Sequence, residues 1–313
     1  MQPSILVVGS INLDLVLKVP KLPEAGENVI GDAYIRVPGG KGANQAVAAA
    51  RLGANVTFVG KIGNDADGAF LSHNLDADGV NTEFLLIDEN VRTGLAVVTV
   101  DARGENDIVV FPGANLEIEE TALRAAFSAR TYDGVLLQLE TSQKIVIETC
   151  KLAHERGVPV FLDAGPAQPF PLEALSPVAV ISPNETETLA LTGIAVKSLA
   201  HADLAASRLI QRSGASAAVL KLGENGAILR CPDGSSEHFP AFAVKAVDTT
   251  AAGDAFNAAL ALTYIQTGDL RAAVTAGNKA GALAATRLGA QSSLPTAVEL
   301  MKFNPDLARE YAL

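Results

Sequence analysis

Short apolar, β-branched runs alternate with segments of helical period along most of the chain, and this alternation restricts the possible folds more than any other feature. The apolar runs lie at residues 5–8, 56–59, 135–139, 158–162, 178–181 and 218–222. The helical segments lie at residues 43–52, 66–77, 142–156, 185–192 and 203–212. Strand and helix repeated in this order predict an α/β fold with a mainly parallel, doubly wound sheet and helices on both faces.

Two stretches break this alternation. Residues 13–37 and residues 93–111, which include the runs TGLAVVTV and DIVVF around a turn at Gly104, are predicted to form antiparallel strands outside the parallel sheet. Such strands would form a small β lid if they cover the carboxyl edge of the sheet, where open α/β sheets bind ligands. An ordinary extension of the main sheet fits the pattern equally well.

The rest of the chain gives no sign of a second domain. Residues 253–288 are rich in alanine and are predicted to be helical with one break near Gly268. Because there is no internal repeat or linker, residues 1–313 are expected to form one domain.

Composition excludes several classes of function. The net charge of −11 argues against a nucleic-acid partner, which requires clustered Lys and Arg. No apolar run is long enough to cross a bilayer, and no basic region precedes the first one, so a cytoplasmic protein without a membrane partner is expected. The two cysteines, Cys150 and Cys231, lack the spacing of a zinc site or a disulfide framework and are expected to fill the core.

The segment DTTAAGD at residues 248–254 precedes a helix-forming run and is the most informative motif. Small residues at Ala251, Ala252 and Gly253 allow an anion to approach the backbone N–H groups of a helix N-terminus, which predicts a phosphate cradle. Asp254 in the same helix mouth is either a base that accepts a proton or an ordinary capping residue.

A second glycine-rich segment, GGKGAN at residues 39–44, also precedes a helix. It does not match a Walker A loop, and Gln45 stands where a GxGxxG motif needs its third glycine. Its glycines permit close backbone approach to a ligand, and Lys41 and Asn44 are available as donors. A plain glycine turn is the alternative.

Polar residues follow several of the predicted strands. Asn12 and Asp14 come after the first strand, and Glu140 follows the strand that ends at residue 139, where such groups suit sugar hydroxyls. Asn184 and Glu187 lie three residues apart at a helix start, so they form either a water-mediated Mg²⁺ site or a capping box.

The motifs GSINLD, GGKGANQA, PNETE and DTTAAGD, in this order between Gly9 and about Pro295, resemble those of the PfkB carbohydrate kinase family, in particular its ribokinase branch. The resemblance implies a ribokinase-like fold and transfer of phosphate from ATP to a hydroxymethyl group of a pentose, with D-ribose expected. Deoxyribose, a ketohexose or a nucleoside is the alternative acceptor, and a non-catalytic sugar-binding protein is a less favoured one. The missing GxGxxG motif argues against a nicotinamide-dependent oxidoreductase.

The resemblance also implies roles for individual residues. Asp254 would be the general base, and Ala252 and Gly253 would form the anion hole. The sugar would be held by Asn12, Asp14, Gly40, Lys41, Asn44, Glu140 and Asp254. ATP would be held by Asn184, Lys221, Gly223, Gly226, Gly253 and Asn278. Mg²⁺ would be positioned by Glu187 with Asn184. An activating K⁺ would be bound by Asp248, Thr250, Ala284, Arg287, Gly289 and Ser293.

Three positions depart from the pattern of that family. Lys221 replaces an expected Thr or Val, Asp163 begins a segment where Asn-Pro-Ala is common, and Asn278 stands in place of a His. A cation at position 221 would reach the phosphates of the nucleotide. If the strands of the lid pair with those of a second copy, a homodimer follows, which would also cover exposed strand edges.

Overall fold

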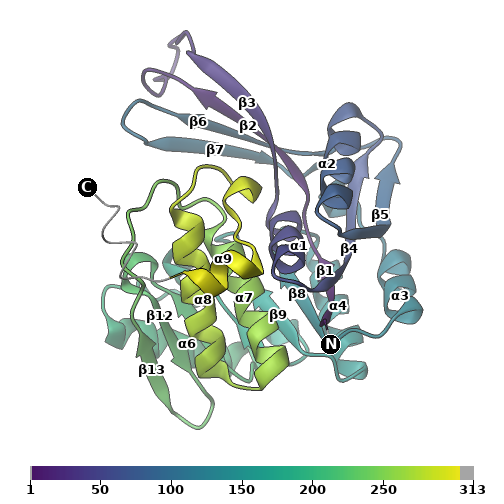
Figure 1. Ribbon diagram of the computed structural model, residues 1–313, viewed down its shortest axis with the longest axis vertical. Coiled ribbons are helices and arrows are strands. Elements are labelled where there is room, and N and C mark those ends of the chain that lie inside the picture. Colours follow the sequence, from purple (N-terminus) through teal and green to yellow (C-terminus); the bar gives the residue numbers. More distant parts are fainter. Residues whose placement is uncertain (1, 304–313) are drawn as a thin grey trace.

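The computed structural model describes residues 2–303, whose strands form two separate sheets (Figure 1). In sheet order, the larger sheet contains β13 (Ser236–Phe239), β12 (Ala227–Arg230), β11 (Ala218–Lys221), β10 (Val180–Ile181), β9 (Val160–Asp163), β8 (Gly134–Gln138), β1 (Ser4–Val8), β4 (Asn55–Gly63) and β5 (Asn81–Asp88). Neighbours from β11 to β5 are parallel, whereas the β11–β12 and β12–β13 pairs are antiparallel. Each of the six predicted runs overlaps one strand of this sheet, which confirms the mainly parallel α/β fold.

Helices cover both faces of the larger sheet, and the strands are apolar on both sides for this reason. The helices are α1 (Lys41–Arg51), α2 (Ala66–Ala77), α3 (Glu120–Ala129), α4 (Gln143–Glu155), α5 (Glu185–Thr192), α6 (Leu199–Ser213), α7 (Ala252–Thr267), α8 (Leu270–Ala285) and α9 (Ala297–Lys302). In β1, Ile5 and Val7 pack into one core cluster with α1, α7 and α8, whereas Leu6 and Val8 pack into another with α3, α4 and α6. Between residues 2 and 303, no helix combines the length and the apolar character needed to cross a membrane.

The smaller sheet projects above the carboxyl edge of the larger one, and its separation excludes a simple extension of the main sheet (Figure 1). Its strands are, in sheet order, β3 (Ala33–Gly39), β2 (Asn12–Lys18), β6 (Gly94–Val100) and β7 (Asn106–Phe111). The β2–β3 and β6–β7 pairs are antiparallel as predicted.

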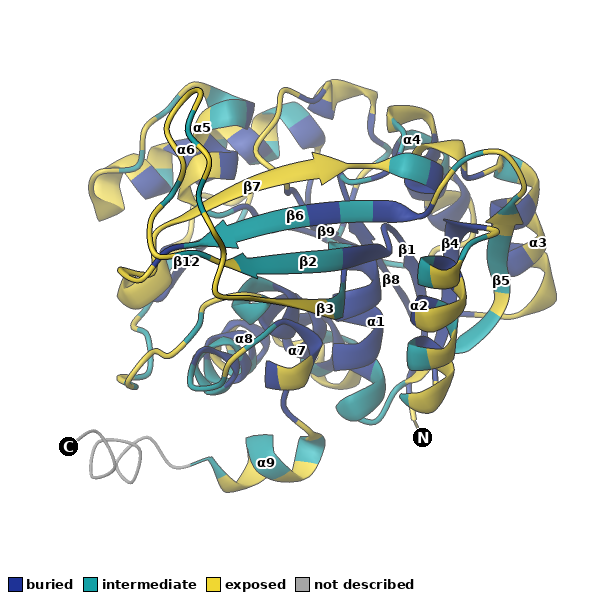
Figure 2. Ribbon diagram, turned by 90° about the horizontal axis from the view of Figure 1, so that it is seen from above, coloured by how far each residue is buried: buried dark blue, intermediate teal, exposed yellow. Residues whose placement is uncertain are grey.

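The central pair of the smaller sheet corrects the expectation of antiparallel strands, because β2 and β6 are parallel. These two strands follow β1 and β5 along the chain, and β1 and β5 run in the same direction in the larger sheet. Strands that continue from the same edge in the same direction meet side by side as a parallel pair. Seen from above, β2, β3, β6 and β7 lie across the end of the larger sheet near α1 and α7 (Figure 2).

Candidate active site

Asp254 lies in the first turn of α7, and its side chain is buried. Asn44 Nδ2 donates a hydrogen bond to its Oδ2 at 2.9 Å, and Gln45 Nε2 donates to its Oδ1 at 3.1 Å. Burial raises the pKa of Asp254 from 3.8 to about 6; Lys41 opposes this increase, and Asp163 adds to it. The carboxylate does not cap the helix, since Ala251 occupies the N-cap position. A carboxylate that titrates near neutral pH in a fixed orientation can act as a general base.

The N-terminus of α7 provides free backbone donors beside this carboxylate. Ala251 adopts a left-handed conformation with φ 60°, and the N–H of Ala252 donates to the Thr249 carbonyl at 3.2 Å. Within residues 2–303, the N–H groups of Gly253 and Asp254 have no acceptor, so Gly253 fits the predicted anion hole, whereas Ala252, whose N–H is already bonded, does not, and Asp254 takes its place. Unpaired N–H groups at a helix N-terminus favour a bound anion, so this turn fits a phosphate group.

Two of the residues that depart from the pattern of the family form one ion pair next to this turn. Lys221 Nζ, at the end of β11, lies 2.5 Å from Oδ1 of Asp163, at the end of β9. The same Nζ lies 3.6 Å from the position that a Cβ atom on Gly253 would occupy. The structure therefore places a positive charge at the predicted phosphate cradle, together with the buried carboxylate that balances it.

Lys41 brings a second positive charge to the same group of side chains. Its Nζ lies 3.6 Å from Asp163 Oδ2 and 3.7 Å from Glu187 Oε1. Burial alone would raise the pKa of Asp163, but the ammonium groups of Lys221 and Lys41 outweigh it and hold that pKa below its ordinary value. Burial likewise opposes the charge of Lys41, yet the surrounding carboxylates, with Asp163 the largest contributor, raise its pKa well above 10.5.

The glycine-rich segment and Glu140 are joined at the start of α1. Glu140 Oε2 accepts hydrogen bonds from the Lys41 N–H at 3.1 Å and from the Ser10 hydroxyl. Gly40 has φ 87°, and a Cβ atom there would lie 2.8 Å from the backbone nitrogen of Asn12. This close packing requires glycine at position 40 and brings the first strand, α1 and the end of β8 into contact.

Asn12 and Asp14 approach the same region from β2. Asn12 Oδ1 accepts a hydrogen bond from Asn115 Nδ2 at 2.7 Å, so its own amide donors remain available for a ligand. Burial, with a smaller contribution from the carboxylates of Glu140 and Asp254, raises the pKa of Asp14 from 3.8 to about 7. These residues surround Asp254 with the mixture of amide donors and carboxylate acceptors that polyol hydroxyls require.

Sequence reasoning missed two buried residues that hold this site together. Asn115 Oδ1 accepts a hydrogen bond from the Ile11 N–H at 2.9 Å, and Asn115 Nδ2 donates to Asn12 Oδ1. Asn115 therefore holds the segment that joins β1 to β2. Gln45 bonds both Asp254 and Asp163. Nothing in the sequence around Asn115 marks it, whereas Gln45 directly follows Asn44 in a segment already identified, and that adjacency was a usable signal.

The predicted nucleotide residues come from the start of α5, the turn after β11, the start of α7, and α8. Asn184 and Glu187 form a reciprocal capping box, with Glu187 N–H to Asn184 Oδ1 at 2.9 Å and Asn184 N–H to Glu187 Oε2 at 2.7 Å. Asn278 Nδ2 donates to the Phe239 carbonyl at 3.1 Å, and Gly226, with φ 86°, packs against that same carbonyl. Gly223 and Gly226 bound the short turn between β11 and β12, and Lys221 ends β11.

The capping box limits how a divalent cation could bind. It occupies Asn184 Oδ1 and Glu187 Oε2 and leaves Glu187 Oε1, which lies 3.7 Å from Lys41 Nζ. Among residues 2–303, no three His, Cys, Asp or Glu side chains gather as metal ligands. Mg²⁺ usually takes only one or two carboxylates and obtains its other ligands from phosphates and water, so Glu187 fits a supporting role.

The six predicted K⁺ ligands lie on two segments that hydrogen bonds bring together. Asp248 Oδ1 accepts from Thr250 N–H at 2.9 Å, and Asp248 Oδ2 accepts from Gly289 N–H at 2.9 Å. The N–H of Arg287 donates to the Ala284 carbonyl at 3.0 Å, and Ser293 bonds the Ala290 carbonyl. These hydrogen bonds close the two segments into one loop.

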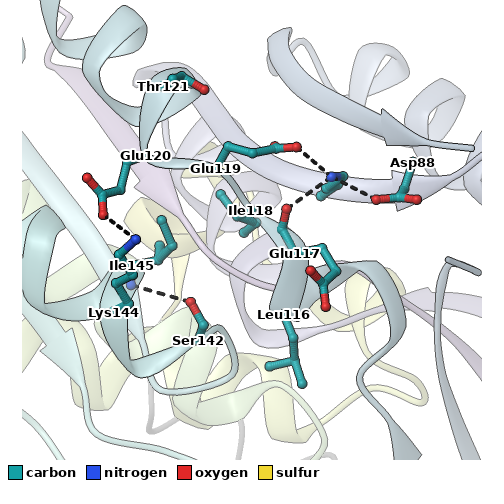
Figure 3. Close-up of a pocket in the computed structure, with 11 residues that line it drawn as sticks. Asp88, Leu116, Glu117, Ile118, Glu119, Glu120, Thr121, Ser142, Lys144 and Ile145 are labelled. Carbon is teal, nitrogen blue, oxygen red and sulfur yellow. Dashed lines mark hydrogen bonds and ion pairs between the residues drawn. The ribbon is translucent and has the colours of Figure 1, made fainter. Parts of the chain in front are cut away.

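A separate surface pocket of about 750 Å³ lies beside the start of α3 and α4 (Figure 3). Lys61 Nζ in its wall contacts Asp88 Oδ2 at 2.8 Å and Glu119 Oε1 at 2.7 Å. None of the residues predicted to hold sugar, nucleotide or cation lines this pocket, so it is distinct from the site around Asp254.

Known proteins resemble this chain over nearly its whole length. The family model for pfkB family carbohydrate kinases matches residues 2–297. A ribokinase of Bacillus subtilis is 39% identical over 299 residues, which cover 95% of this chain and 98% of that protein. A deoxyribokinase of Salmonella typhimurium is 35% identical and covers 93% of this chain and 95% of its own length. The structure of Arabidopsis thaliana ribokinase complexed with ribose and ATP superposes with a TM-score of 0.86 at 31% identity, covering 97% of this chain and 100% of that one.

Proposed function

This chain belongs to the pfkB family of carbohydrate kinases, and we propose that it transfers the γ-phosphate of ATP to the hydroxymethyl group of D-ribose, giving ribose 5-phosphate. The observation that supports the reaction most strongly is the position of Asp254. Its buried carboxylate, with a pKa of about 6, stands in the same helix turn as two free N–H groups. Proton acceptor and anion site thus lie within one helical turn.

In the proposed reaction, Asp254 accepts the proton of the attacking hydroxyl. The oxygen of that hydroxyl forms a bond to the γ-phosphorus, and the bond from this phosphorus to the β–γ bridging oxygen breaks to release ADP. Charge on the equatorial oxygens is stabilised by the N–H groups at Gly253 and Asp254 and by Lys221 Nζ. The reaction needs little more than such positioning and charge stabilisation, because phosphoryl transfer passes through a loose transition state.

The remaining roles are assigned by position. The sugar would be held by Asn12, Asp14, Gly40, Lys41, Asn44 and Glu140. ATP would be held by Asn184, Lys221, Gly223, Gly226, Gly253 and Asn278. Mg²⁺, supported by Glu187 with Asn184, would neutralise phosphate charge when bound. K⁺, bound by the loop that Asp248 closes, would order the segment that leads into α7 and thus the anion hole.

Deoxyribose is the second candidate acceptor, because a deoxyribokinase relative is almost as similar as the ribokinases. A pocket built to hydrogen-bond a hydroxyl rejects an analogue without it by a large factor, roughly 10⁴ to 10⁵. Relative kcat/KM for ribose and deoxyribose therefore separates the two candidates.

The four-stranded sheet is proposed to act as a lid over the sugar and as the surface through which two copies associate. The edge strand β7 is exposed along its length (Figure 2). Its apolar side chains Ile108, Val110 and Phe111 are more than half exposed. Apolar strand edges of this kind favour pairing with another chain. A second copy of the sheet would cover them and close the lid.

The deciding experiment is coupled ADP production from Mg-ATP with ribose, deoxyribose, fructose or adenosine, each with K⁺ and with Na⁺. Ribose-dependent turnover that K⁺ increases is the expected result. Turnover only with another acceptor would support the proposed phosphoryl transfer but would show that the pocket around Asn12 and Asp14 is specific for that acceptor. ATP hydrolysis without sugar should be slow, because an open lid leaves the site incomplete. No turnover with any acceptor would contradict the proposal.

A further inference from the structure

Gln45 lies on α1 with its side chain fully buried, and its amide group contacts three other side chains. Nε2 donates to Asp254 Oδ1 at 3.1 Å and to Asp163 Oδ2 at 2.9 Å, and Oε1 accepts from Gln138 Nε2 at 2.7 Å. We infer that Gln45 is a positioning residue that joins the base Asp254 and the ion pair of Asp163 with Lys221 into one hydrogen-bonded unit. The inference rests on the proposed function, since it assigns Asp254 the role of base.

Charge determines which way the Gln45 amide faces. An amide has two N–H donors on one side and an acceptor on the other, and two carboxylates can be satisfied only by the donor side. The acceptor side then needs a buried donor of its own, which Gln138 supplies. Reversal would place Oε1 against both carboxylates, so Gln138 holds Gln45 in the one orientation that serves both.

The position of Gln45 on α1 connects the base with the sugar site. Asn44 and Gln45 are adjacent and hold the two oxygens of Asp254, while α1 begins at Lys41, whose backbone N–H bonds Glu140. If the bound sugar displaced α1, it would therefore move the two amide groups that donate hydrogen bonds to the Asp254 carboxylate. Through Asp163, this displacement would also reach Lys221 at the phosphate cradle.

Several charged groups also act on Asp254, and a test must separate their effect from that of the neutral Gln45 amide. Lys41 on α1 lowers the pKa of Asp254 and Asp163 on β9 raises it. Asp14 on β2 interacts with Asp254, and Glu140 and Glu187 act on Lys41. Lys221 on β11 neutralises Asp163. A substitution at Gln45 should leave all of these charges in place.

The test compares Gln45→Met, which keeps the volume and removes both donors, with the unsubstituted protein. Asp254 is titrated by carboxyl ¹³C NMR without any sugar, and Asp254→Asn identifies its signal. Loss of a donor to the charged form should raise the pKa of Asp254 by roughly one to two pH units. The acid limb of kcat/KM for the sugar should move to higher pH by the same amount.

Gln138→Met is the second variant, because it leaves Gln45 in place and removes only the donor that orients it. The expected result is a smaller rise in the pKa of Asp254, in the same direction. An unchanged titration of Asp254 in both variants would overturn the inference, and Gln138→Met decides alone if Gln45→Met does not fold. The NMR titration needs no sugar. A protein that phosphorylates no sugar would therefore contradict the proposed function, whereas the titration of Asp254 would still test the role of Gln45.

Discussion

Lys221 and Asp163 are 58 residues apart in the chain, yet their charged atoms lie 2.5 Å apart at the ends of two strands of the larger sheet. Each departs from the pattern of the family when taken alone. Together they form a buried pair, since Asp163 is fully buried and the Lys221 side chain is 12% exposed. Each charge therefore neutralises the other inside the protein, where an unpaired charge would be costly.

Lys221→Thr is expected to destabilise the protein by about 3 kcal/mol, because removal of one partner leaves a buried charge. The value lies at the low end of the usual range because Lys41 and Gln45 still contact Asp163. The double variant Lys221→Thr with Asp163→Asn should recover most of this loss. Urea unfolding of the unsubstituted protein, the two single variants and the double variant measures the coupling energy between the two residues. Additive effects of the two substitutions would contradict a shared role.

Asp254→Asn is expected to reduce kcat by roughly 10² to 10⁴, because Asn cannot accept the proton of the attacking hydroxyl. Steady-state assays with the preferred sugar measure the loss, and thermal unfolding checks that the variant is folded. Turnover near that of the unsubstituted protein would remove Asp254 from the role of base.

The activity of the unsubstituted protein should rise through an acid limb near pH 6, since the pKa of Asp254 is about 6 and only its ionised form accepts a proton. The pH dependence of kcat/KM, which reports the free enzyme, measures it. A limb near pH 4, where an ordinary carboxyl titrates, would show that burial does not govern this group.

Asp14→Asn is expected to change the dependence of stability on pH. The pKa of Asp14 is 3.8 in the unfolded chain and about 7 in the folded protein, so between these values the folded protein retains a proton that the unfolded chain releases. Stability therefore falls as the pH rises from about 4 to 7, and Asp14→Asn removes this decrease. Between pH 4 and pH 8, the free energy of unfolding of the variant should rise relative to that of the unsubstituted protein. Parallel curves would contradict the raised pKa.

The fold was largely predictable because burial on both faces leaves an unambiguous mark on the sequence. Strands such as β1 and β8 are buried throughout and read as continuous apolar runs. The strands β5, β12 and β13 escaped notice, and of these β5 and β13 contain no fully buried residue. The parallel pairing of β2 with β6 depends on how two distant segments leave the larger sheet, which local pattern does not record.

The site was predictable only where its residues stand in short motifs. Asp254 and Asn44 belong to segments whose small residues indicate that a ligand can approach the backbone closely. Gln45 and Gln138 are 93 residues apart, and Asn115 lies 103 residues from Asn12, so their roles exist only through contacts across the sheet. The capping box of Asn184 and Glu187 was anticipated as an alternative to a metal site, and the structure shows the box itself.

Association through the four-stranded sheet should depend on the apolar side chains of β7. Ile108→Glu with Val110→Glu is expected to give a monomer, because buried carboxylates would oppose pairing of the sheets. Sedimentation equilibrium measures the mass, with the unsubstituted protein expected at twice the chain mass. Leu204→Glu on α6, which is also exposed, is the control and should remain dimeric. A monomeric unsubstituted protein at micromolar concentration would contradict the proposed dimer.

Ala251→Gly is expected to stabilise the protein by about 1 kcal/mol. Ala251 is the only non-glycine residue among residues 2–303 with a positive φ, and its Cβ atom is unfavourable in the left-handed conformation. Glycine removes this strain without moving the N–H groups of the helix mouth. Ala252→Gly, one residue later with helical backbone, is the matched control and should lose up to about 1 kcal/mol. Chemical denaturation of both variants measures the difference. Equal destabilisation by the two substitutions would show that position 251 holds no strain.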